Sequence, residues 1–400
     1  MKIAILADFH LGYAKFLEDS FEQAGDAFSQ ACKTADLVVI LGDIFDTRIP
    51  KQEILARSFK LFRVAFEKKW DARLVSYDSR DGRKNYAEVP VVAIHGTHER
   101  RTKELVNPVE LLEKAGFVVN AHSATAVFEK DGERVAFQGM GGVPEEYAKS
   151  AIEALSLKPV EGAFNIFLFH QSMKEFIPGE GLMGVEDLPK GFDLYLCGHM
   201  HTKMIEKLDG GALLLIPGST VITQMRKEDM EGKGFFIFDT KNREAAFQRI
   251  QTRPFLYDEL EFKDAGVEEI SRKTRSSIER LLKDKEGEKP VIKIKLKGTV
   301  AKGLSPSNLD TRSFVREFEG RAIVEVDKDL ESESLKDKIE KLRNLREGKM
   351  SVKDMGIEIL KDKLKQYGFK SNVDAESLYA LLSEEGKGSP DKALKRILGM

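Results

Sequence analysis

The sequence predicts an α/β (α+β) protein in which two packed β-sheets are flanked by helices, followed by a small α+β domain and a helical C-terminal tail. Three features predict this class. Apolar runs alternate with helical patterns over the first quarter of the chain, and more apolar runs follow with few helices between them. Charge density then rises near residue 250, which marks the start of smaller modules.

The spacing of apolar side chains places the elements of the first domain, expected at residues 1–250. Short apolar runs predict strands at 2–7, 37–41, 89–94, 134–138, 163–169, 193–197, 212–216 and 234–239. Helical patterns lie at 20–34, 51–69, 107–115 and 144–155. Many strands with few later helices favour two sheets with helices outside over a single doubly wound sheet.

From residue 251 the pattern changes to a small α+β capping domain, expected at 251–327. Its predicted strands are 255–262, 291–296 and 322–326, and its predicted helices are 265–284 and 311–319. Residues 328–350 are dominated by charge and are expected to form a linker. Residues 351–400 carry apolar side chains at helical spacing and are expected to form a helical tail.

The composition excludes several classes of protein. Residues 1–250 hold 32 basic and 37 acidic side chains and residues 251–400 hold 32 and 29, so any nucleic-acid contact must use local basic patches. No apolar run approaches the roughly 18 residues of a membrane helix, and the first residues lack a signal-peptide pattern, so we expect a cytoplasmic protein with no membrane contact. Cys32 and Cys197 are too few for a disulfide framework.

Five of the predicted strands lead into side chains that commonly bind metals. These side chains are Asp8 and His10, Asp43, His98, His170, and His199 with His201. Ligand sites in α/β sheets form beyond the carboxyl ends of the strands, where the loops converge. We therefore expect carboxylates and imidazoles to meet at one edge. His95 and His122 fit no motif and are expected to be structural.

The spacing within this set predicts two ions. Asp8 and His10 stand two residues apart, as do His199 and His201, so in an extended segment both members of a pair point to the same side and can hold one ion. Two carboxylates with several imidazoles exceed what one ion takes. Two ions roughly 3.5 to 4 Å apart clamp the attacking and leaving oxygens in phosphoryl transfer, which favours phosphoester hydrolysis.

These motifs resemble the calcineurin-like metallophosphoesterase superfamily over about residues 1–240, and more narrowly the DNA double-strand-break repair nucleases of the Mre-eleven (SbcD) family in its archaeal form. The segments that carry the resemblance are Asp8-Phe9-His10-Leu11-Gly12-Tyr13, Gly42-Asp43-Ile44-Phe45, Leu188-Pro189, Gly198-His199-Met200-His201 and Pro217-Gly218-Ser219. A small second domain and a helical tail follow in that family as well, and the resemblance implies that residues 251–327 form a capping and DNA-binding domain and residues 351–400 a partner-binding tail.

The resemblance implies a site with two Mn²⁺ ions per chain. Carried over by position, the implied ligands are Asp8, His10 and His201 at the first ion, Asp43 between both ions, and Thr97, His170 and His199 at the second. The resemblance also implies that His98 is the catalytic histidine, which contacts the scissile phosphate or protonates the leaving oxygen. Mixed carboxylate and imidazole ligation suits manganese or iron.

Two positions depart from the family pattern. Thr97 stands where the family usually has an asparagine. A hydroxyl is a shorter and weaker ligand than an amide carbonyl, so we expect weaker binding of the second ion. Asp46 stands where many relatives carry another histidine, which bears on exonuclease activity. Neither change removes the bridging carboxylate.

The function implied by the resemblance is a manganese-dependent DNA nuclease, with 3′ to 5′ exonuclease and single-strand endonuclease activity on DNA ends in double-strand break repair. The family also implies a homodimer, and an SMC-like ATPase of the Rad-fifty (SbcC) type bound through the C-terminal helices. The helices at 51–69 and 107–115 are candidate dimer elements, or they simply pack on the core. Their apolar side chains are Leu61, Phe62, Val109 and Leu112.

Two alternatives stay open at this level. The ligand set also fits a phosphodiesterase that acts on a small-molecule phosphoester such as a nucleotide, although the long segment after the first domain counts against it. A non-catalytic scaffold with the same fold is the second alternative. Thr97 motivates it, whereas the retention of His98 and the other ligands opposes it.

Overall fold

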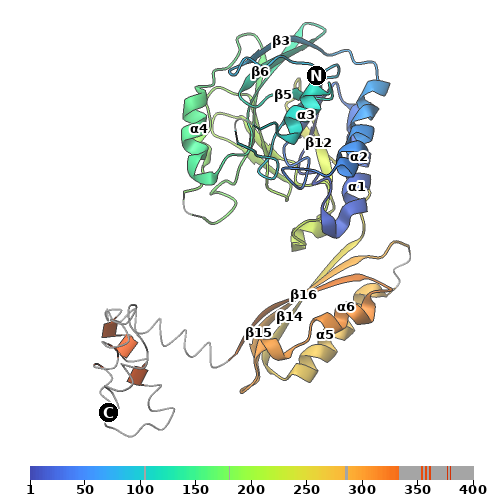
Figure 1. The fold of residues 1–400 in the computed structure, drawn as a ribbon, viewed down its shortest axis with the longest axis vertical. Coiled ribbons are helices and arrows are strands. Elements are labelled where there is room, and N and C mark those ends of the chain that lie inside the picture. Colours follow the sequence, from blue (N-terminus) through green and yellow to red (C-terminus); the bar gives the residue numbers. More distant parts are fainter. Residues whose placement is uncertain are drawn as a thin grey trace. The chain divides into compact units, whose positions relative to one another are not determined.

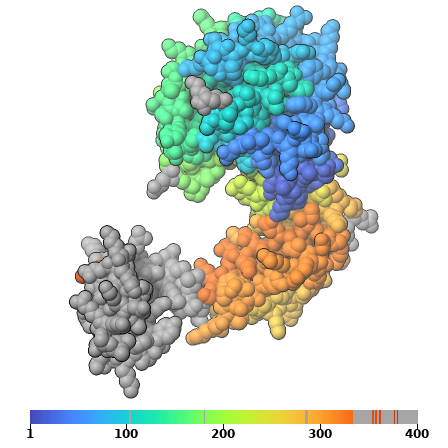
Figure 2. All heavy atoms as spheres, viewed as in Figure 1, coloured from blue at the N-terminus to red at the C-terminus, as the bar shows by residue number. Residues whose placement is uncertain are grey.

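The computed structural model describes residues 1–102, 105–179, 181–283 and 287–332, with 353–354, 356–357, 360–361, 376 and 379. The chain divides into two compact units. Unit 1 comprises Met1–Tyr257 and a return segment that ends at Val291, and unit 2 begins at Asp258 and continues from Ile292. Unit 1 thus extends slightly beyond the residue 250 expected from the sequence. In Figure 2 the visible face of unit 1 is formed mostly by its N-terminal part, coloured blue to green.

The described part of unit 1 contains two mixed sheets. The six-stranded sheet has the order β13 (Glu244–Arg249), β12 (Gly234–Asp239), β1 (Lys2–Leu6), β2 (Leu37–Leu41), β4 (Val91–Ile94), β5 (Val119–Asn120). The seven-stranded sheet has the order β10 (Met204–Lys207), β11 (Leu213–Ile216), β9 (Leu194–Gly198), β8 (Phe164–His170), β7 (Glu133–Met140), β6 (Ala124–Lys130), β3 (Arg73–Ser79). The runs β1–β2–β4 and β7–β8–β9 are parallel, so each sheet brings several carboxyl ends to one edge.

Helices cover the outer faces of the two sheets, which confirms the predicted class (Figure 1). The six-stranded sheet packs against α1 (Leu17–Thr34), α2 (Gln52–Phe62) and α3 (Pro108–Lys114). The seven-stranded sheet packs against α4 (Ala148–Leu155). The 3-10 helices of unit 1 are η1 (Ala14–Phe16), η2 (Arg63–Glu67), η3 (Glu145–Tyr147), η4 (Val185–Asp187) and η5 (Lys227–Glu231).

Strand β1 shows why the sequence contains unbroken apolar runs. Ala4 and Leu6 pack toward the helices, whereas Ile3 and Ile5 pack between the two sheets. All four side chains are fully buried. A strand that is covered on both faces has no polar side, so its residues are apolar without alternation.

Unit 2 is built on a three-stranded sheet in the order β14 (Phe255–Ala265), β15 (Val291–Val300), β16 (Ile323–Ser332). Its helices are α5 (Val267–Leu282), η6 (Pro306–Asn308) and α6 (Arg312–Phe318). Along β15, Ile292, Ile294 and Leu296 are buried, in agreement with the alternation in the sequence. Strand β16 continues to Ser332, so the predicted linker at 328–350 begins inside a strand. The rest of that linker and nearly all of the predicted tail lie outside the described residues.

The four side chains considered for a dimer contact lie in the core of unit 1. Phe62, Val109 and Leu112 are fully buried and Leu61 is 9% exposed, and all four pack beneath the helices of the six-stranded sheet. These four side chains therefore pack on the core, as the second interpretation expected, and a dimer contact of these helices would have to use other side chains. None of the helices in the described part of the chain combines the length and the apolar character that a membrane span requires.

The packing of α1 predicts a large effect of one core substitution. Phe28 is fully buried, and its ring centroid lies 5.2 Å from that of Phe62 in an edge-to-face contact. Phe28→Ala should lower the free energy of unfolding by about 3–5 kcal/mol, because the cavity is only partly closed by relaxation. Tyr86→Ala is the control, since Tyr86 is 56% exposed and should change stability by less than about 1 kcal/mol. Equal losses for both variants in urea unfolding would contradict this packing.

Candidate metal centre

The predicted strand-end residues meet in three clusters within the described part of the chain, each with ligand atoms within 4.8 Å of one another. The first cluster is Asp8, His10 and His201, and the second cluster is Asp43, His170 and His199. The third cluster shares His10 and adds Asp46 and His98. The backbone N–H of His199 donates to Asp8 Oδ1 at 3.2 Å, which ties the first two clusters together.

Left-handed backbone turns bring these residues into place. The angle φ is 51° at Asp8, 46° at His10, 46° at Asp43 and 74° at His199. The segments are not extended as expected, since β1 and β9 end before them. Asp8 and His10 still meet in one cluster, as expected, whereas the prediction that His199 and His201 hold one ion together is wrong, because they lie in different clusters. Asp and His accept this conformation more readily than most residues. Each such turn still costs on the order of 1–3 kcal/mol, and strain of this kind gathers at functional sites.

In the first cluster, two imidazoles turn the same ring nitrogen inward. His10 Nε2 lies 3.1 Å from His201 Nε2, and His201 Nε2 lies 3.9 Å from Asp8 Oδ1. The outer nitrogens are engaged, because His10 Nδ1 lies 3.2 Å from Asp46 Oδ1 and His201 Nδ1 lies 2.6 Å from Thr223 Oγ1. An ionised carboxylate only accepts hydrogen bonds, so His10 Nδ1 carries the proton and Nε2 presents a lone pair. A proton or a cation between the two Nε2 atoms relieves their repulsion.

The second cluster repeats this arrangement. His170 Nδ1 donates to the carbonyl oxygen of Leu41 at 2.6 Å, and His170 Nε2 lies 3.2 Å from Asp43 Oδ2. The ring centroids of His170 and His199 are 5.1 Å apart. A neutral His170 therefore points a lone pair at a carboxylate oxygen, which is unfavourable unless a positive charge stands between them.

The donor set fits divalent metal ions. Asp8 Oδ2 is buried and has no hydrogen-bond partner among the residues that the structure describes. An ionised oxygen in that position is costly without a cation. Carboxylate oxygens and imidazole nitrogens together suit manganese, iron or zinc better than calcium or magnesium. In His10, His170 and His201 the inward nitrogen is backed by a contact at the opposite ring nitrogen, which is typical of metal-binding histidines.

The pKa values of the cluster residues are set by burial and by the charges of their neighbours. Burial raises the pKa of Asp8 to about 6, with a further contribution from Asp43. Burial disfavours the charged form of His170, but the adjacent Asp43 more than offsets this and raises its pKa to about 9. Burial lowers the pKa of His201 to about 2, together with His10 and Lys233. His201 is thus neutral near pH 7 and its lone pair is available.

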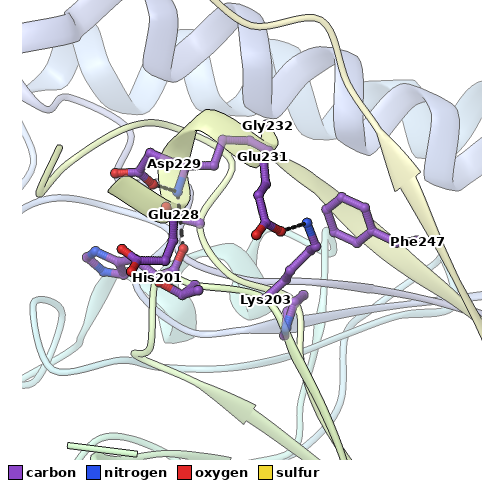
Figure 3. A pocket seen from close by; sticks show the side chains of 11 residues that line it. His201, Lys203, Glu228, Asp229, Glu231, Gly232 and Phe247 are labelled. Carbon is purple, nitrogen blue, oxygen red and sulfur yellow. Dashed lines mark hydrogen bonds and ion pairs between the residues drawn. The ribbon is translucent and has the colours of Figure 1, made fainter. Parts of the chain in front are cut away.

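A polar pocket borders His201 on its outer side (Figure 3). Lys233 donates from Nζ to the His201 carbonyl oxygen at 3.1 Å and pairs with the buried carboxylate of Asp229. Lys203 and Glu231 form a second ion pair at 2.6 Å across this pocket. These contacts fix the backbone that carries His201 and place a positive charge close to the first cluster.

Thr97 and His98 lie on the loop after β4, which wraps around Asp43. The backbone N–H of His98 donates to Asp43 Oδ1 at 2.9 Å, and Thr97 Oγ1 donates to Asp43 Oδ2 at 3.4 Å. His98 Nδ1 donates to the carbonyl oxygen of Asp46 at 2.9 Å, and its side chain is 44% exposed. Thr97 therefore borders the second cluster, and His98 stands at the open side of the site.

Glu99 is a site residue that the sequence reasoning missed. Its fully buried carboxyl accepts from the backbone N–H groups of Phe45, at 2.9 Å, and Gly96, at 2.8 Å. It therefore locks the loop after β2 to the loop after β4. Burial and the nearby Asp43 raise the pKa of Glu99 to about 8. Its position directly after His98 was the one signal in the sequence that could have identified it.

His95 and His122 lie outside all three clusters, in agreement with the prediction that they are structural. Their ring centroids are 4.5 Å apart, and His122 Nδ1 accepts from the backbone N–H of Gly141 at 2.9 Å. Burial lowers their pKa values to about 3 and about 4, so both are neutral near pH 7.

Comparisons with known proteins agree with this geometry. Residues 1–203 match the family model described as calcineurin-like phosphoesterase. The chain is 26% identical to the DNA double-strand break repair protein Mre11 of Sulfolobus acidocaldarius, over 100% of this chain and 99% of that protein. It is 30% identical to the protein of the same name from Thermoplasma acidophilum, over 74% of this chain and 76% of that protein.

The pKa of His170 predicts a pH-dependent affinity for metal. His170 holds a proton up to about pH 9 in the metal-free protein, and this proton must leave before Nε2 can bind an ion. The affinity of the second cluster for a divalent cation should rise between pH 6.5 and 8.5 by up to about tenfold per pH unit, with release of about one proton. Calorimetric titrations in two buffers of different ionisation enthalpy measure both quantities. A flat affinity without proton release would contradict this charge assignment.

Proposed function

The chain belongs to the calcineurin-like phosphoesterases and, within them, to the Mre11 family of DNA double-strand break repair proteins, and on this premise we propose that it is a manganese-dependent nuclease that processes DNA ends. The family makes it a metal-dependent phosphodiesterase of double-strand break repair. The finer part of the proposal is the use of Mn²⁺ and the two activities, a 3′ to 5′ exonuclease and a single-strand endonuclease.

The inward-facing lone pairs of the first and second clusters carry this proposal. We assign Asp8, His10 and His201 to a first ion and His170 and His199 to a second, with Asp43 between them and Thr97 beside the second. Two divalent ions in such a site activate a water and offset the negative charge that develops on the phosphate. The protein holds their ligands in place before substrate arrives, through the contacts to Leu41, Asp46 and Thr223.

His98 is proposed to act on the phosphate. Its Nδ1 is engaged by the Asp46 carbonyl oxygen, which orients the ring and leaves Nε2 free on a side chain that is 44% exposed. A ring in this position can donate a proton from Nε2 to the leaving oxygen or contact the scissile phosphate. Asp46 supports this residue with its carbonyl and supports His10 with its carboxylate, so it is proposed as a positioning residue.

The proposal also includes two protein partners, an ATPase and a second copy of this chain. The match to the relative from Sulfolobus acidocaldarius extends over the whole chain, so the C-terminal segment has a counterpart there. We propose that this segment binds an SMC-like ATPase of the Rad-fifty (SbcC) type. A homodimer is proposed as well, through side chains other than the four that are buried in the core of unit 1.

Two substitutions distinguish the proposed role of Asp43 as a metal ligand from that of His98, which acts on the phosphate. Asp43→Asn should abolish cleavage of DNA and reduce occupancy of both ions, because one charge serves two cations. His98→Gln should lower the cleavage rate by about 10²–10⁴-fold while both ions remain bound. Mn²⁺ content and cleavage of end-labelled DNA, measured on the same samples, test both expectations. An empty metal site in the His98→Gln protein would show that His98 has been given the wrong role.

The same samples should be assayed on bis-p-nitrophenyl phosphate. The proposed function predicts Mn²⁺-dependent cleavage of DNA by the unaltered protein. Cleavage of the small ester without any cleavage of DNA would favour a phosphodiesterase for small molecules. Metal binding without cleavage of either substrate would favour a non-catalytic scaffold.

Position 97 sets the affinity of the second ion in this proposal. Thr97→Asn should tighten Mn²⁺ binding at the second cluster, since a carbonyl oxygen reaches further than a hydroxyl. Thr97→Val keeps the shape, removes the oxygen and should weaken binding there by up to about tenfold. Binding at the first cluster serves as the internal control and should not change. Indistinguishable second-site affinities for the three proteins in calorimetric titration would exclude position 97 as a ligand or water-bridged ligand.

A further inference from the structure

Glu145 brings a further carboxylate to the edge of the second cluster. It is the first residue of η3, in the loop region after β7. Strand β7 runs parallel to β8, with Met140 paired to Phe169, so this loop leaves the sheet at the same edge as His170. Glu145 Oε1 lies 4.0 Å from His199 Nε2. Strand β7 is therefore the sixth strand whose end leads to a side chain at the site.

The loop that carries Glu145 is fixed on two sides. On one side, the backbone N–H of Gly142 donates to the carbonyl oxygen of His95 at 2.8 Å, just before the Thr97–His98 loop. On the other side, Gln171 Nε2 donates to the carbonyl oxygen of Val143 at 3.1 Å, directly after His170. The backbone N–H of Ser172 donates to Glu145 Oε1 itself at 3.2 Å. The carboxylate is thus held beside the ligand-bearing loops.

One oxygen of this carboxylate has no partner. Glu145 Oε2 is buried and makes no hydrogen bond to any part of the chain that the structure describes. Within the same described ranges, no Lys or Arg side chain forms an ion pair with Glu145. A buried carboxylate oxygen without a donor or a cation is unfavourable. Asp8 Oδ2 likewise lacks a hydrogen-bond partner at the first cluster, on a side chain that is fully buried, whereas the Glu145 side chain as a whole is 36% exposed.

The second cluster supplies fewer ligands than a divalent ion usually takes. Asp43, His170 and His199 supply three ligand atoms, and the hydroxyl of Thr97 is directed at Asp43. Cations such as Mn²⁺ accept about six ligands. Ligands with bonds of about 2.1 Å to one ion lie about 3.0 Å apart when adjacent and about 4.2 Å apart when opposite. The separation of 4.0 Å between Glu145 Oε1 and His199 Nε2 falls in this range, but Glu145 lies outside the group of ligand atoms that Asp43, His170 and His199 place within 4.8 Å of one another, so its side chain must turn toward them to bind the ion.

We propose that Glu145 is an additional ligand of the second metal site. A rotation of its side chain would bring the carboxylate to the ion held by Asp43, His170 and His199, while the Ser172 N–H continues to orient it. Glu145 then supplies the strong oxygen ligand that Thr97 does not. This inference rests on the proposed two-ion function and adds a residue to its second site.

Titration of the full-length protein with Mn²⁺ alone tests this role without any nuclease assay. Glu145→Gln keeps the shape and an acceptor for Ser172 but removes the charge. It should weaken Mn²⁺ binding at the second site by about tenfold or more and leave the first site unchanged. Glu146→Gln is the matched control, because Glu146 is the exposed neighbour and its loss should alter neither affinity. Calorimetry measures both affinities, and electron paramagnetic resonance counts the free Mn²⁺.

Two further variants sharpen the result. Glu145→Asp keeps the charge on a shorter side chain and should bind with intermediate affinity. Thr97→Asn, added to Glu145→Gln, should recover part of the lost affinity, because both residues serve the same ion. The melting temperatures of the metal-free proteins should agree, which shows that each variant is folded.

Equal second-site affinities for the unaltered protein, Glu145→Gln and Glu146→Gln would overturn the role of Glu145. Two-site binding by the unaltered protein would still stand in that case, and with it the proposed function. If the unaltered protein bound no Mn²⁺ at all, the proposed function itself would fail together with this inference.

Discussion

The close packing of three loops around the Asp43 carboxylate is the constraint on which the site depends. That carboxylate is contacted by the N–H of His98 at 2.9 Å and by His170 Nε2 at 3.2 Å. A Cβ atom at Gly96 would lie 2.0 Å from Asp43 Oδ1, and a Cβ atom at Gly198 would lie 2.1 Å from the Leu41 carbonyl oxygen. Any larger residue at either position would push the strand ends apart. The two sheets can therefore share one site only because these positions lack side chains.

The charges gathered at this edge explain why the folded site favours cations. Asp8 and Asp43 are buried among histidines whose inward nitrogens carry lone pairs. Without metal, protons fill part of this role, as the raised pKa values of His170 and Asp8 show. The contacts behind the ligands and the buried Glu99 keep the cluster assembled. Divalent cations would replace the protons and complete a site that is already formed.

Some elements could be predicted from the sequence because burial on both faces leaves a clear pattern. The strands β1, β2, β8 and β9 are covered on both sides, and the apolar runs predicted them closely. Strand β3 was missed, since it lies at a sheet edge and its side chains are largely exposed, with Val75 at 49%. The apolar stripe of α2 left two interpretations open, because a stripe that faces the core has the same spacing as one that faces a partner.

The site could be predicted only where its residues directly follow a strand. Asp8, Asp43 and His170 stand at or near the ends of apolar runs, and the structure brings them to one edge as expected. The left-handed turns could not be predicted, because the spacing of Asp8 and His10 also fits an extended segment. Glu145 could not be found either. It lies five residues beyond β7, and only the parallel pairing of β7 with β8 places it near His199.

The central claim is that two divalent ions bind side by side between the two sheets. Anomalous diffraction at the manganese edge, from crystals grown with Mn²⁺, tests this claim most directly. The account predicts two peaks roughly 3.5 to 4 Å apart, one beside Asp8, His10 and His201 and the other beside His170 and His199, with Asp43 between them. A single peak, or peaks away from these residues, would contradict it.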